Sequence, residues 1–318
     1  MCYKLLQGDF VLMILWVEVV LVMCLRVGLM SRHLPPTEPG TGMAIAVKRN
    51  DQKSRQGHSE WLNEIKYLRR LRHPNIVKLI GYSSENNHLI LVYEFIGKGS
   101  LASHLYGSPS KCETLSWTIR KKVALDVAKV LAFLHSDEVH VIYRDVKTSN
   151  ILLDSNYNAK LGDFGLVRNG PEGHESYVST TLIKGAERDE SHVSTSRNGT
   201  LGYVSPEYLN TGRLTKKNDV YGFGVVLREL MSGRHVLDTN RPKRKYHLVN
   251  WAKPLLIDRK RISKVMDARI KGQYSERETG RIAHLAIQCL SVEPKLRPTM
   301  DEVVRSLEHL QDYKTHRR

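Results

Sequence analysis

Two neighbouring stretches decide the fold of this chain, and they read VIYRDVKTSNILL at 141–153 and LGDFG at 161–165. In the first stretch Asp145 and Asn150 are five residues apart, and Asp163 follows Asp145 by 18 residues. Chemistry on phosphate groups needs a carboxylate that orients the attacking hydroxyl, a carboxylate and an amide that hold Mg²⁺, and cations that neutralise the phosphate. A lone Asp in a loop is usually a turn or capping residue. The joint occurrence of these residues between apolar runs therefore predicts a phosphoryl-transfer site.

The composition around these stretches is that of a globular protein. With 318 residues, of which 41% are hydrophobic and 26% charged, the chain is long enough for two lobes that each have a core. This excludes a disordered tail, a collagen-like fibre and a small disulfide scaffold. The four cysteines are scattered without a C-x-x-C pair, which suits a reducing compartment and argues against a structural zinc site.

The charge is strongly positive, at +16, and favours anionic partners. The densest basic run, RPKRK at 241–245, is either a nuclear-localisation or lipid-binding patch or a solvated loop. Nothing in the sequence is similar to a nucleic-acid recognition fold, so we expect no specific nucleic-acid partner.

The first 30 residues differ from the rest. The stretch 10–25 is apolar except for Glu18, and as a helix it would span about 24 Å, short of a bilayer core of about 30 Å. Three interpretations stay open: a marginal membrane anchor, a buried strand or helix, or a sequence foreign to the native protein through truncation or mis-splicing. Residues 31–42 then read as a loop, because Pro and Gly are frequent there.

From residue 43 the pattern becomes regular. Alternating small and β-branched residues predict a strand at 44–48, and apolar runs predict strands at 76–82 and 88–95. Leu62, Ile65, Leu68 and Leu71 repeat on one face of a helix expected at 60–72. Further helices are expected after an N-cap at Ser116, at 218–232 closed by Gly233, at 278–290, and at 299–311 with a capping box. Strands thus dominate the first third and helices the rest.

Taken together, the segments resemble the eukaryotic protein kinase domain from residue 43 to about 311. The matching motifs include AVK (46–48), HPNIVKLIGY (73–82), VIYRDVKTSNILLD (141–154), GDFGL (162–166), GTLGYVSPEY (199–208) and DVYGFGVVLREL (219–230). More narrowly, these motifs are similar to those of plant receptor-like cytoplasmic kinases, a group related to Pelle and the interleukin-1-receptor-associated kinases.

The resemblance implies an α+β, bilobal fold. It places a small β-rich N-lobe, expected to be incomplete, at 43–96 and a large α-helical C-lobe at 97–311. The remaining parts are the apolar segment 1–30, the loop 31–42 and a basic tail at 312–318.

The resemblance also implies residue roles. Lys48 would reach the α- and β-phosphates of ATP, and Glu64, 16 residues later, would hold Lys48 in place. Asp145 would be the catalytic base and Lys147 would contact the γ-phosphate. Asn150 and Asp163 would bind Mg²⁺. Tyr93 would be the gatekeeper of a hinge whose backbone, from Glu94 to Ile96, binds adenine.

Other implied roles concern the large lobe. Glu207 would pair with Arg297, and Asp219 would brace the catalytic loop. Arg144 would read a phosphate on the activation segment, and Thr200 would contact substrate or Asp145. Candidate phosphosites lie in a local duplication, in which 170–180 and 185–195 match at 7 of 11 positions; they are Ser179, Thr180, Ser194, Thr195 and the adjoining Ser196.

By the same resemblance, we expect an ATP- and Mg²⁺-dependent Ser/Thr kinase in plant signalling and defence. Its partners would be protein substrates and an upstream receptor kinase. Its location would be the cytoplasm, with peripheral contact at the inner face of the plasma membrane. Residue 2 is Cys2, which excludes N-myristoylation and leaves palmitoylation as the acylation to consider.

Three departures from the family pattern stand out. Tyr143 replaces the His of H-R-D, and Ser205 replaces the Ala of A-P-E. More seriously, only Gly40 and Gly42 lie shortly before Lys48, so the G-x-G-x-x-G loop that covers ATP phosphates is missing from the sequence. The alternative is therefore a catalytically weak or inactive kinase-fold scaffold or decoy.

Overall fold

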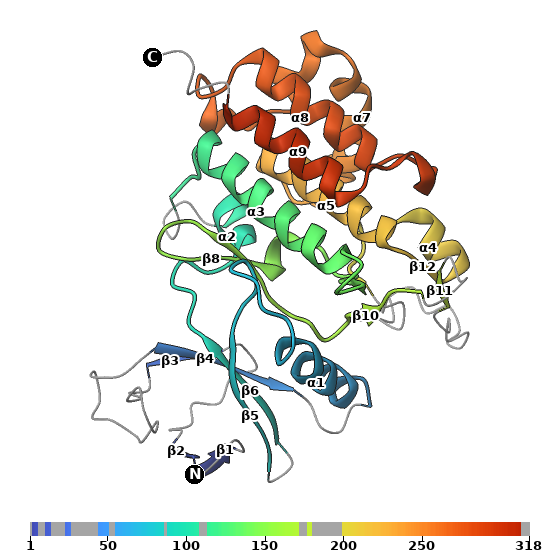
Figure 1. Ribbon diagram of the computed structural model, residues 1–318. Helices are drawn as coiled ribbons and strands as arrows, with labels where there is room; N and C mark the ends of the chain where they lie inside the picture. The colour runs from blue at the N-terminus through green and yellow to red at the C-terminus, as the bar shows by residue number, and fades with distance from the viewer. Residues whose placement is uncertain are drawn as a thin grey trace. The chain divides into compact units, whose positions relative to one another are not determined.

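The computed structural model describes residues 2–5, 10–13, 23–26, 44–50, 55–85, 88–107, 113–171, 177–179 and 199–312 (Figure 1). The chain divides into two compact units. The first comprises Met1–Gly97 with Gly162–Gly165, and the second comprises Lys98–Leu161 with Leu166–Arg318. The first unit is built on a sheet and the second is mostly helical, so the expected α+β class is confirmed.

The sheet of the first unit is antiparallel with the strand order β3-β4-β6-β5. These strands are β3 (Met23–Arg26), β4 (Ala44–Asn50), β5 (Leu79–Glu85) and β6 (His88–Glu94). Along β4 the burial alternates, with Ile45 and Val47 buried, as expected for a strand with one covered face. A separate antiparallel pair is formed by β1 (Cys2–Leu5) and β2 (Phe10–Met13).

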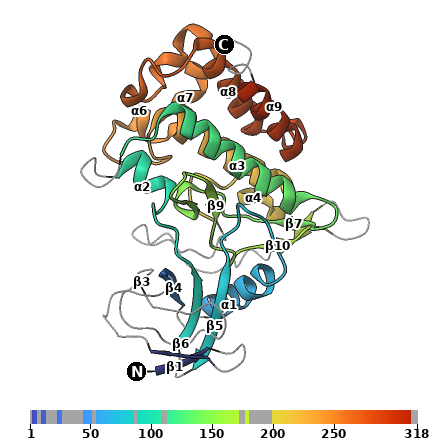
Figure 2. The same ribbon diagram turned by 60° about the vertical axis from the view of Figure 1, so that its left-hand side comes forward.

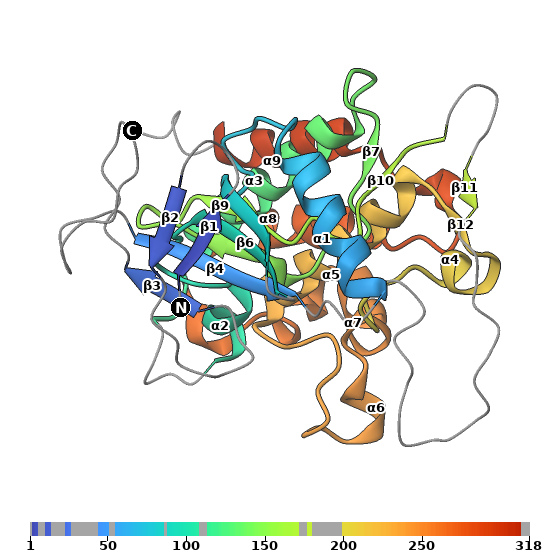
Figure 3. The ribbon, with the colours of Figure 1, turned by 90° about the horizontal axis from the view of Figure 1, so that it is seen from below.

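Helix α1 (Arg55–Leu68) packs against β4, β5 and β6 and lies beside the sheet in Figure 3. It begins and ends earlier than the expected 60–72, although hydrogen bonds from the Arg69 and Leu71 N–H groups continue its last turn. The prediction of its apolar face is partly wrong, because the Leu62 side chain is 48% exposed. Trp61 occupies the covered side instead, where its indole N–H donates to the Ile90 carbonyl at 3.1 Å.

The strands around α1 are also shifted relative to expectation. The run expected at 76–82 forms a strand at Leu79–Glu85, and the run expected at 88–95 ends at Glu94. Pairing explains the shift, since β5 is in register with β6 out to the pair Glu85 and His88.

The described parts of the apolar N-terminal stretch are strands. Both β2 and β3 fall within 10–26, and β3 pairs antiparallel with β4 from Met23 opposite Val47 to Arg26 opposite Ala44. The three interpretations of the whole stretch 1–30 stay predictions. Among the residues that the structure describes, no helix combines the length and apolar character needed to cross a bilayer.

The second unit consists of helices joined by short strand pairs. Its α-helices are α2 (Leu101–Tyr106), α3 (Trp117–His135), α4 (Pro206–Thr211), α5 (Lys216–Ser232), α6 (Lys243–Tyr246), α7 (Leu248–Ile257), α8 (Glu276–Cys289) and α9 (Met300–Asp312). Its 3₁₀ helices are η1 (Thr148–Asn150), η2 (Arg259–Lys264), η3 (Ala268–Ile270) and η4 (Pro294–Leu296). The strand pairs are β7 (Val141–Ile142) with β10 (Arg168–Asn169), β8 (Ile151–Leu153) with β9 (Ala159–Leu161), and β11 (Val178–Ser179) with β12 (Arg213–Leu214).

Helix α5 is the centre of this unit. All of its residues from Asn218 to Ser232 are buried, and it packs against α3, α7 and α8. Local sequence sets its ends: Thr215 forms a capping box with Asn218, and Gly233 closes the helix at φ +62°, a conformation that favours glycine. The expected N-cap at Ser116 and the capping box that Thr299 forms with Glu302 are likewise confirmed.

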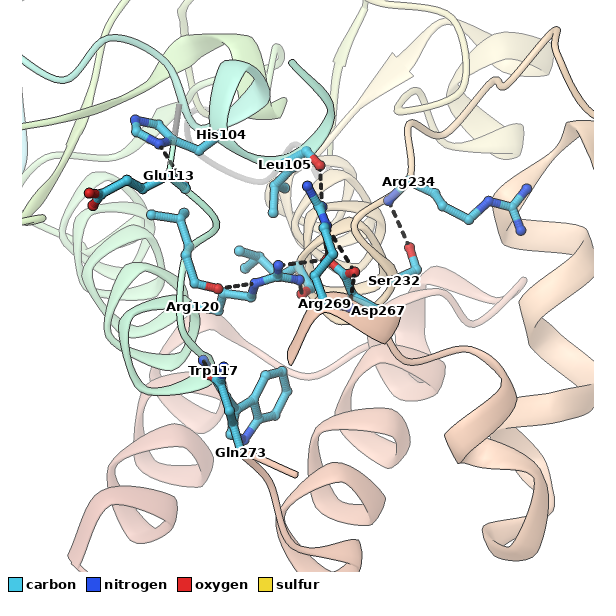
Figure 4. A network of polar contacts seen from close by, with 12 residues as sticks. His104, Leu105, Glu113, Trp117, Arg120, Ser232, Arg234, Asp267, Arg269 and Gln273 are labelled. Carbon is cyan, nitrogen blue, oxygen red and sulfur yellow. Dashed lines mark hydrogen bonds and ion pairs between the residues drawn. The ribbon is translucent and has the colours of Figure 1, made fainter. Parts of the chain in front are cut away.

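A buried ion-pair network ties α3 to the end of α5 and to the residues around the start of η3 (Figure 4). The fully buried Arg120 guanidinium donates to the Asp267 carboxylate at 2.6 Å and to the Leu230 carbonyl at 2.9 Å. Arg269 donates to the same carboxylate at 2.8 Å. Gly233 lies so close that a Cβ there would be 2.2 Å from Asp267 Oδ2, so this glycine serves both the helix end and the network.

Candidate active site

In the first unit, three of the expected site residues converge. Lys48 on β4 places its Nζ 3.0 Å from Glu64 Oε2 on α1 and 2.8 Å from Asp163 Oδ1, just after β9. Burial alone would lower the pKa of Lys48, but the two carboxylates outweigh it and raise the pKa above the usual range. The lysine is therefore a fixed cation at neutral pH.

Helix α1 also holds the backbone of the LGDFG stretch. Glu64 is fully buried and its Oε1 accepts from the Phe164 N–H at 2.9 Å, while Asn63 donates to the Gly165 carbonyl at 2.9 Å. A Cβ on Gly165 would lie 2.9 Å from Glu60 Cβ, so glycine permits this close approach. Burial raises the pKa of Glu64, and the Lys48 cation opposes that rise.

In the second unit, the Asp145 carboxylate gathers three donors. Lys147 Nζ lies 2.6 Å from Oδ2, and the Asn150 amide donates to the same oxygen at 2.9 Å. The Thr200 hydroxyl donates to Oδ1 at 2.8 Å and accepts from Lys147 at 2.9 Å. Asp145 is 4% exposed, so a hydroxyl that reaches it meets a buried, oriented acceptor next to a cation.

A carboxylate on α5 holds the loop that carries Asp145. Asp219 accepts from the backbone N–H groups of Tyr143 at 2.8 Å and Arg144 at 2.7 Å, and from His135 Nε2 at 2.8 Å. Arg144 has φ +74°, a region that costs a non-glycine residue about 1–2 kcal/mol. The two backbone hydrogen bonds to Asp219 hold this loop in place despite that cost.

The expected Mg²⁺ ligands have donor atoms that suit the ion. Asp163 offers a carboxylate that is 43% exposed, and the Asn150 amide nitrogen is bound to Asp145, which makes the amide oxygen the atom able to act as a ligand. Mg²⁺ is usually held by one or two such oxygens plus substrate phosphates. Within the described part of the chain no cluster of three or more His, Cys, Asp or Glu could hold a metal.

The expected hinge lies at the end of β6. Tyr93 is buried, and burial beside the Glu64 carboxylate raises its pKa well above the usual value. The Glu94 N–H donates to the Lys78 carbonyl at 3.0 Å, and a Glu94 side-chain oxygen accepts from the Lys78 N–H at 2.8 Å. The Glu94 N–H is therefore already used within the first unit. Adenine binding at the hinge would depend on the backbone N–H and C=O groups that follow it, up to the buried Ile96.

A partly buried ion pair lies further along the second unit. The Arg297 guanidinium forms a bidentate ion pair with Glu207, with distances of 2.6 Å to Oε1 and 2.7 Å to Oε2. Burial alone would raise the pKa of Glu207, but the hydrogen bonds from Arg297 hold it below the usual range. The structure thus brings together these two residues, 90 positions apart in sequence.

Sequence reasoning missed a polar cluster centred on Glu229. Both carboxylate oxygens of Glu229, on α5, accept from the Tyr203 hydroxyl at 2.8 Å, and one also accepts from the Val236 N–H at 2.8 Å. Thr148, in the Asp145 loop, hydrogen-bonds both Tyr203 and Tyr106. The signal that could have found this cluster is Glu229, which together with Arg228 interrupts the apolar run of α5.

Burial raises the pKa of Glu229 from 4.5 to about 7, although the Tyr203 hydroxyl opposes the rise. Because the folded state then binds more protons between these values, the contribution of Glu229 to stability is complete below pH 4.5 and is lost as pH rises through 7. The glutamine of Glu229→Gln cannot titrate. We therefore expect the free energy of unfolding of this variant, relative to that of wild type, to rise by on the order of 3 kcal/mol between pH 4.5 and pH 8. Urea unfolding of both proteins at these two pH values measures the change. If the difference in unfolding free energy between variant and wild type were the same at both pH values, the raised pKa of Glu229 would be contradicted.

The activation-segment expectations are only partly within the described residues. Val178 and Ser179, from the first copy of the duplication, pair as β11 with Arg213 and Leu214. Thr180, Ser194, Thr195 and Ser196 lie outside the described residues. The buried Arg144 guanidinium donates to the Tyr208 hydroxyl at 2.7 Å and to the Leu166 carbonyl at 3.1 Å.

Comparison with known proteins finds relatives over most of the chain. The family model "Protein kinase domain" matches residues 34–307. The chain is 54% identical over 284 residues to receptor-like cytoplasmic kinase 176 of rice, covering 89% of this chain and 68% of that protein. It is 53% identical over 279 residues to the serine/threonine-protein kinase BIK1 of Arabidopsis thaliana, covering 88% and 67%. Identity is 51% over 268 residues to an EPD1-interacting receptor-like cytoplasmic serine/threonine-protein kinase of Nicotiana benthamiana, covering 84% and 54%.

Proposed function

The chain belongs to the protein kinase family, among the plant receptor-like cytoplasmic serine/threonine kinases, and we propose that Asp145 is the base of its phosphoryl-transfer site. The observation that carries the proposal is the Thr200 hydroxyl, which donates to the Asp145 carboxylate at 2.8 Å beside the Lys147 cation. A substrate serine or threonine hydroxyl placed there would be oriented, and its proton would have an acceptor.

Lys147 supports this step in two ways. Its cation lies 2.6 Å from Asp145 Oδ2 and helps to hold the carboxylate in a fixed orientation. The same cation would lie beside a substrate hydroxyl that occupies this position. It would then stabilise the negative charge on the phosphoryl group during transfer.

Lys48, Glu64 and Asp163 would act on the nucleotide. Glu64 fixes the Lys48 cation, which would neutralise the α- and β-phosphates of ATP. Asp163 and Asn150 would hold Mg²⁺; the bound ion supplies charge neutralisation and alignment of the phosphate oxygens. The backbone from Glu94 to Ile96 would hydrogen-bond adenine.

Activation-segment phosphorylation would regulate this site through Arg144. Its Nε is buried without a hydrogen-bond partner among the described residues, and a phosphate brings strong acceptors that pair with guanidinium groups. We take Ser179, Thr180, Ser194, Thr195 and Ser196 as the candidate acceptors.

We place this activity in cytoplasmic, receptor-linked signalling, downstream of a receptor kinase and with protein substrates. The support is that the rice and Nicotiana relatives are receptor-like cytoplasmic kinases, and that the Nicotiana protein is named as EPD1-interacting. Peripheral contact with the inner face of the plasma membrane is part of the same proposal.

A second candidate function is a kinase-fold scaffold or decoy with little catalysis. It is favoured by one observation, the lack of a G-x-G-x-x-G segment before Lys48. Without backbone donors over the β- and γ-phosphates, the positioning on which phosphoryl transfer depends is weakened.

The experiment that tests the proposed function is Lys48→Met, assayed for incorporation of labelled phosphate from Mg²⁺–ATP. We expect phosphoserine and phosphothreonine from wild type, and a loss of at least about a hundredfold in Lys48→Met, because a fixed cation next to the phosphates is removed. The matched control is Lys253→Met at an exposed lysine of α7, which should leave the rate within about twofold. Equal rates in wild type and Lys48→Met would contradict the role of Lys48.

A further inference from the structure

A basic groove lies on the second unit, away from every residue assigned above. It has a volume of about 970 Å³ and is lined by η2, α8 and α9. We define the basic groove by its cationic and histidine side chains, which are Arg259, Lys260, Arg277, Arg281, His284 and His309. Figure 2 shows α8 and α9 side by side, with α7 next to α8.

The groove follows from the amphipathic pattern of α8. Ile282, Ala286 and Cys289 turn toward the core and are buried. The lining residues Arg277, Arg281, His284 and Gln288 recur at intervals of four and three residues, and this spacing places them on one face. The sequence thus places a basic row along the helix face opposite the core.

The charge of the groove is one-sided. Four permanent cations, Arg259, Lys260, Arg277 and Arg281, line it together with one carboxylate, Glu276. Two acids of α8 and α9 form ion pairs with α3: Glu278 with Lys121, and Glu308 with Lys129 at 2.9 Å. Asp258 caps the start of η2 by accepting from the Lys260 N–H at 3.0 Å.

Gly280 keeps the middle of the groove open. It lines the groove in the interior of α8, where glycine costs roughly 1 kcal/mol relative to alanine. Neither packing nor a positive φ requires it, because a Cβ there would meet nothing within 4 Å. A side chain at this position would instead point into space that the glycine leaves open.

We propose that the basic groove docks a phosphorylated peptide segment of a partner protein. Arginine forks match phosphate oxygens two at a time, and three of the four cations are arginines. From Arg277 to Gln288 the row extends for about 16 Å, which matches about five residues of an extended peptide and exceeds a single phosphate. Cations gathered around a hollow suit an inserted segment better than a flat lipid surface.

The first test measures binding of a fluorescent short peptide that carries two phosphoserines, using the full chain. We expect saturable binding that weakens with rising salt, and no comparable binding of the unphosphorylated peptide. Arg259→Glu/Lys260→Glu and Arg277→Glu/Arg281→Glu should each weaken binding by at least about tenfold, since each adds repulsion where attraction was. The matched control is Arg244→Glu/Lys245→Glu on α6, an exposed basic pair with the same change in charge, expected to stay within about twofold.

The second test changes the shape without changing the charge. Gly280→Trp should fill the groove and weaken binding by at least about tenfold, while Gly280→Ala should leave it within about twofold. Thermal unfolding of every variant confirms that the fold persists.

Three outcomes would overturn the proposal. The first is that the α6 control loses as much phosphopeptide affinity as the groove variants. The second is that Gly280→Trp binds the phosphopeptide as tightly as wild type. The third is that inositol hexaphosphate or phosphatidylserine vesicles bind more tightly than the phosphopeptide, in a way that the groove variants weaken. Because none of these variants touches the Asp145 or Lys48 clusters, phosphate transfer should continue in all of them. Docking and the proposed activity can therefore fail separately.

Discussion

Asp145→Asn should lower the rate of phosphate transfer from Mg²⁺–ATP by about 10²–10⁴, the usual contribution of a positioned general base. The amide keeps the shape of the carboxylate and can still accept from the Thr200 hydroxyl, but it cannot take up a proton and loses its attraction to Lys147. The fold should persist, because the loop is held by Asp219 through backbone hydrogen bonds that the substitution leaves intact.

The comparison needs a control with the same chemical change. Asp137→Asn alters an exposed carboxylate beyond the end of α3 and should leave the rate within about twofold. Steady-state rates and ATP affinity of both variants separate loss of chemistry from loss of binding, since a base should affect the rate constant and not ATP affinity. Full activity in Asp145→Asn would mean that the proton leaves by another route.

Arg297→Met should lower the free energy of unfolding by about 3 kcal/mol, near the lower end of the range for breaking a buried ion pair. The guanidinium is fully buried and also donates to the carbonyls of Ser291 and Lys217 at 2.9 and 3.0 Å, so several acceptors lose their donor at once. The lower end is expected because Glu207 is 24% exposed and water can solvate part of its charge.

Urea unfolding with two further variants checks this result. Arg305→Met, at an exposed position of α9, should change stability by less than about 0.5 kcal/mol. Adding Glu207→Gln to Arg297→Met should cost little more than Arg297→Met alone, because the stranded carboxylate is removed with its partner gone. A cost for Arg297→Met below about 1 kcal/mol would contradict a structural role for this pair.

The sequence is most informative where chemistry or helix ends depend on local spacing. Ser116, Thr299 and Gly233 predict helix ends because capping depends on residues a few positions apart. The separation of Lys48 and Glu64 and the RDVKTSN and DFG motifs identify residues that the structure gathers in two clusters.

Other features depend on residues far apart in the chain and leave little local trace. The exposure of Leu62 depends on which side of α1 the sheet covers, and that side is chosen by Trp61 packing onto β6. The Arg120–Asp267 pair joins residues 147 positions apart. The Glu229 cluster forms because tertiary packing brings two tyrosines and Thr148 to one buried carboxylate, which no spacing in the sequence encodes.

The central claim is that this chain transfers phosphate through the Asp145 and Lys48 clusters despite its unusual sequence before Lys48. The most direct measurement is the transfer of labelled γ-phosphate from Mg²⁺–ATP by the purified full-length chain, with an EDTA-treated sample as blank. We predict phosphate on serine and threonine above the blank, abolished in Asp145→Asn. A chain that unfolds cooperatively, yet neither binds Mg²⁺–ATP nor transfers phosphate, would contradict the claim and favour the scaffold function.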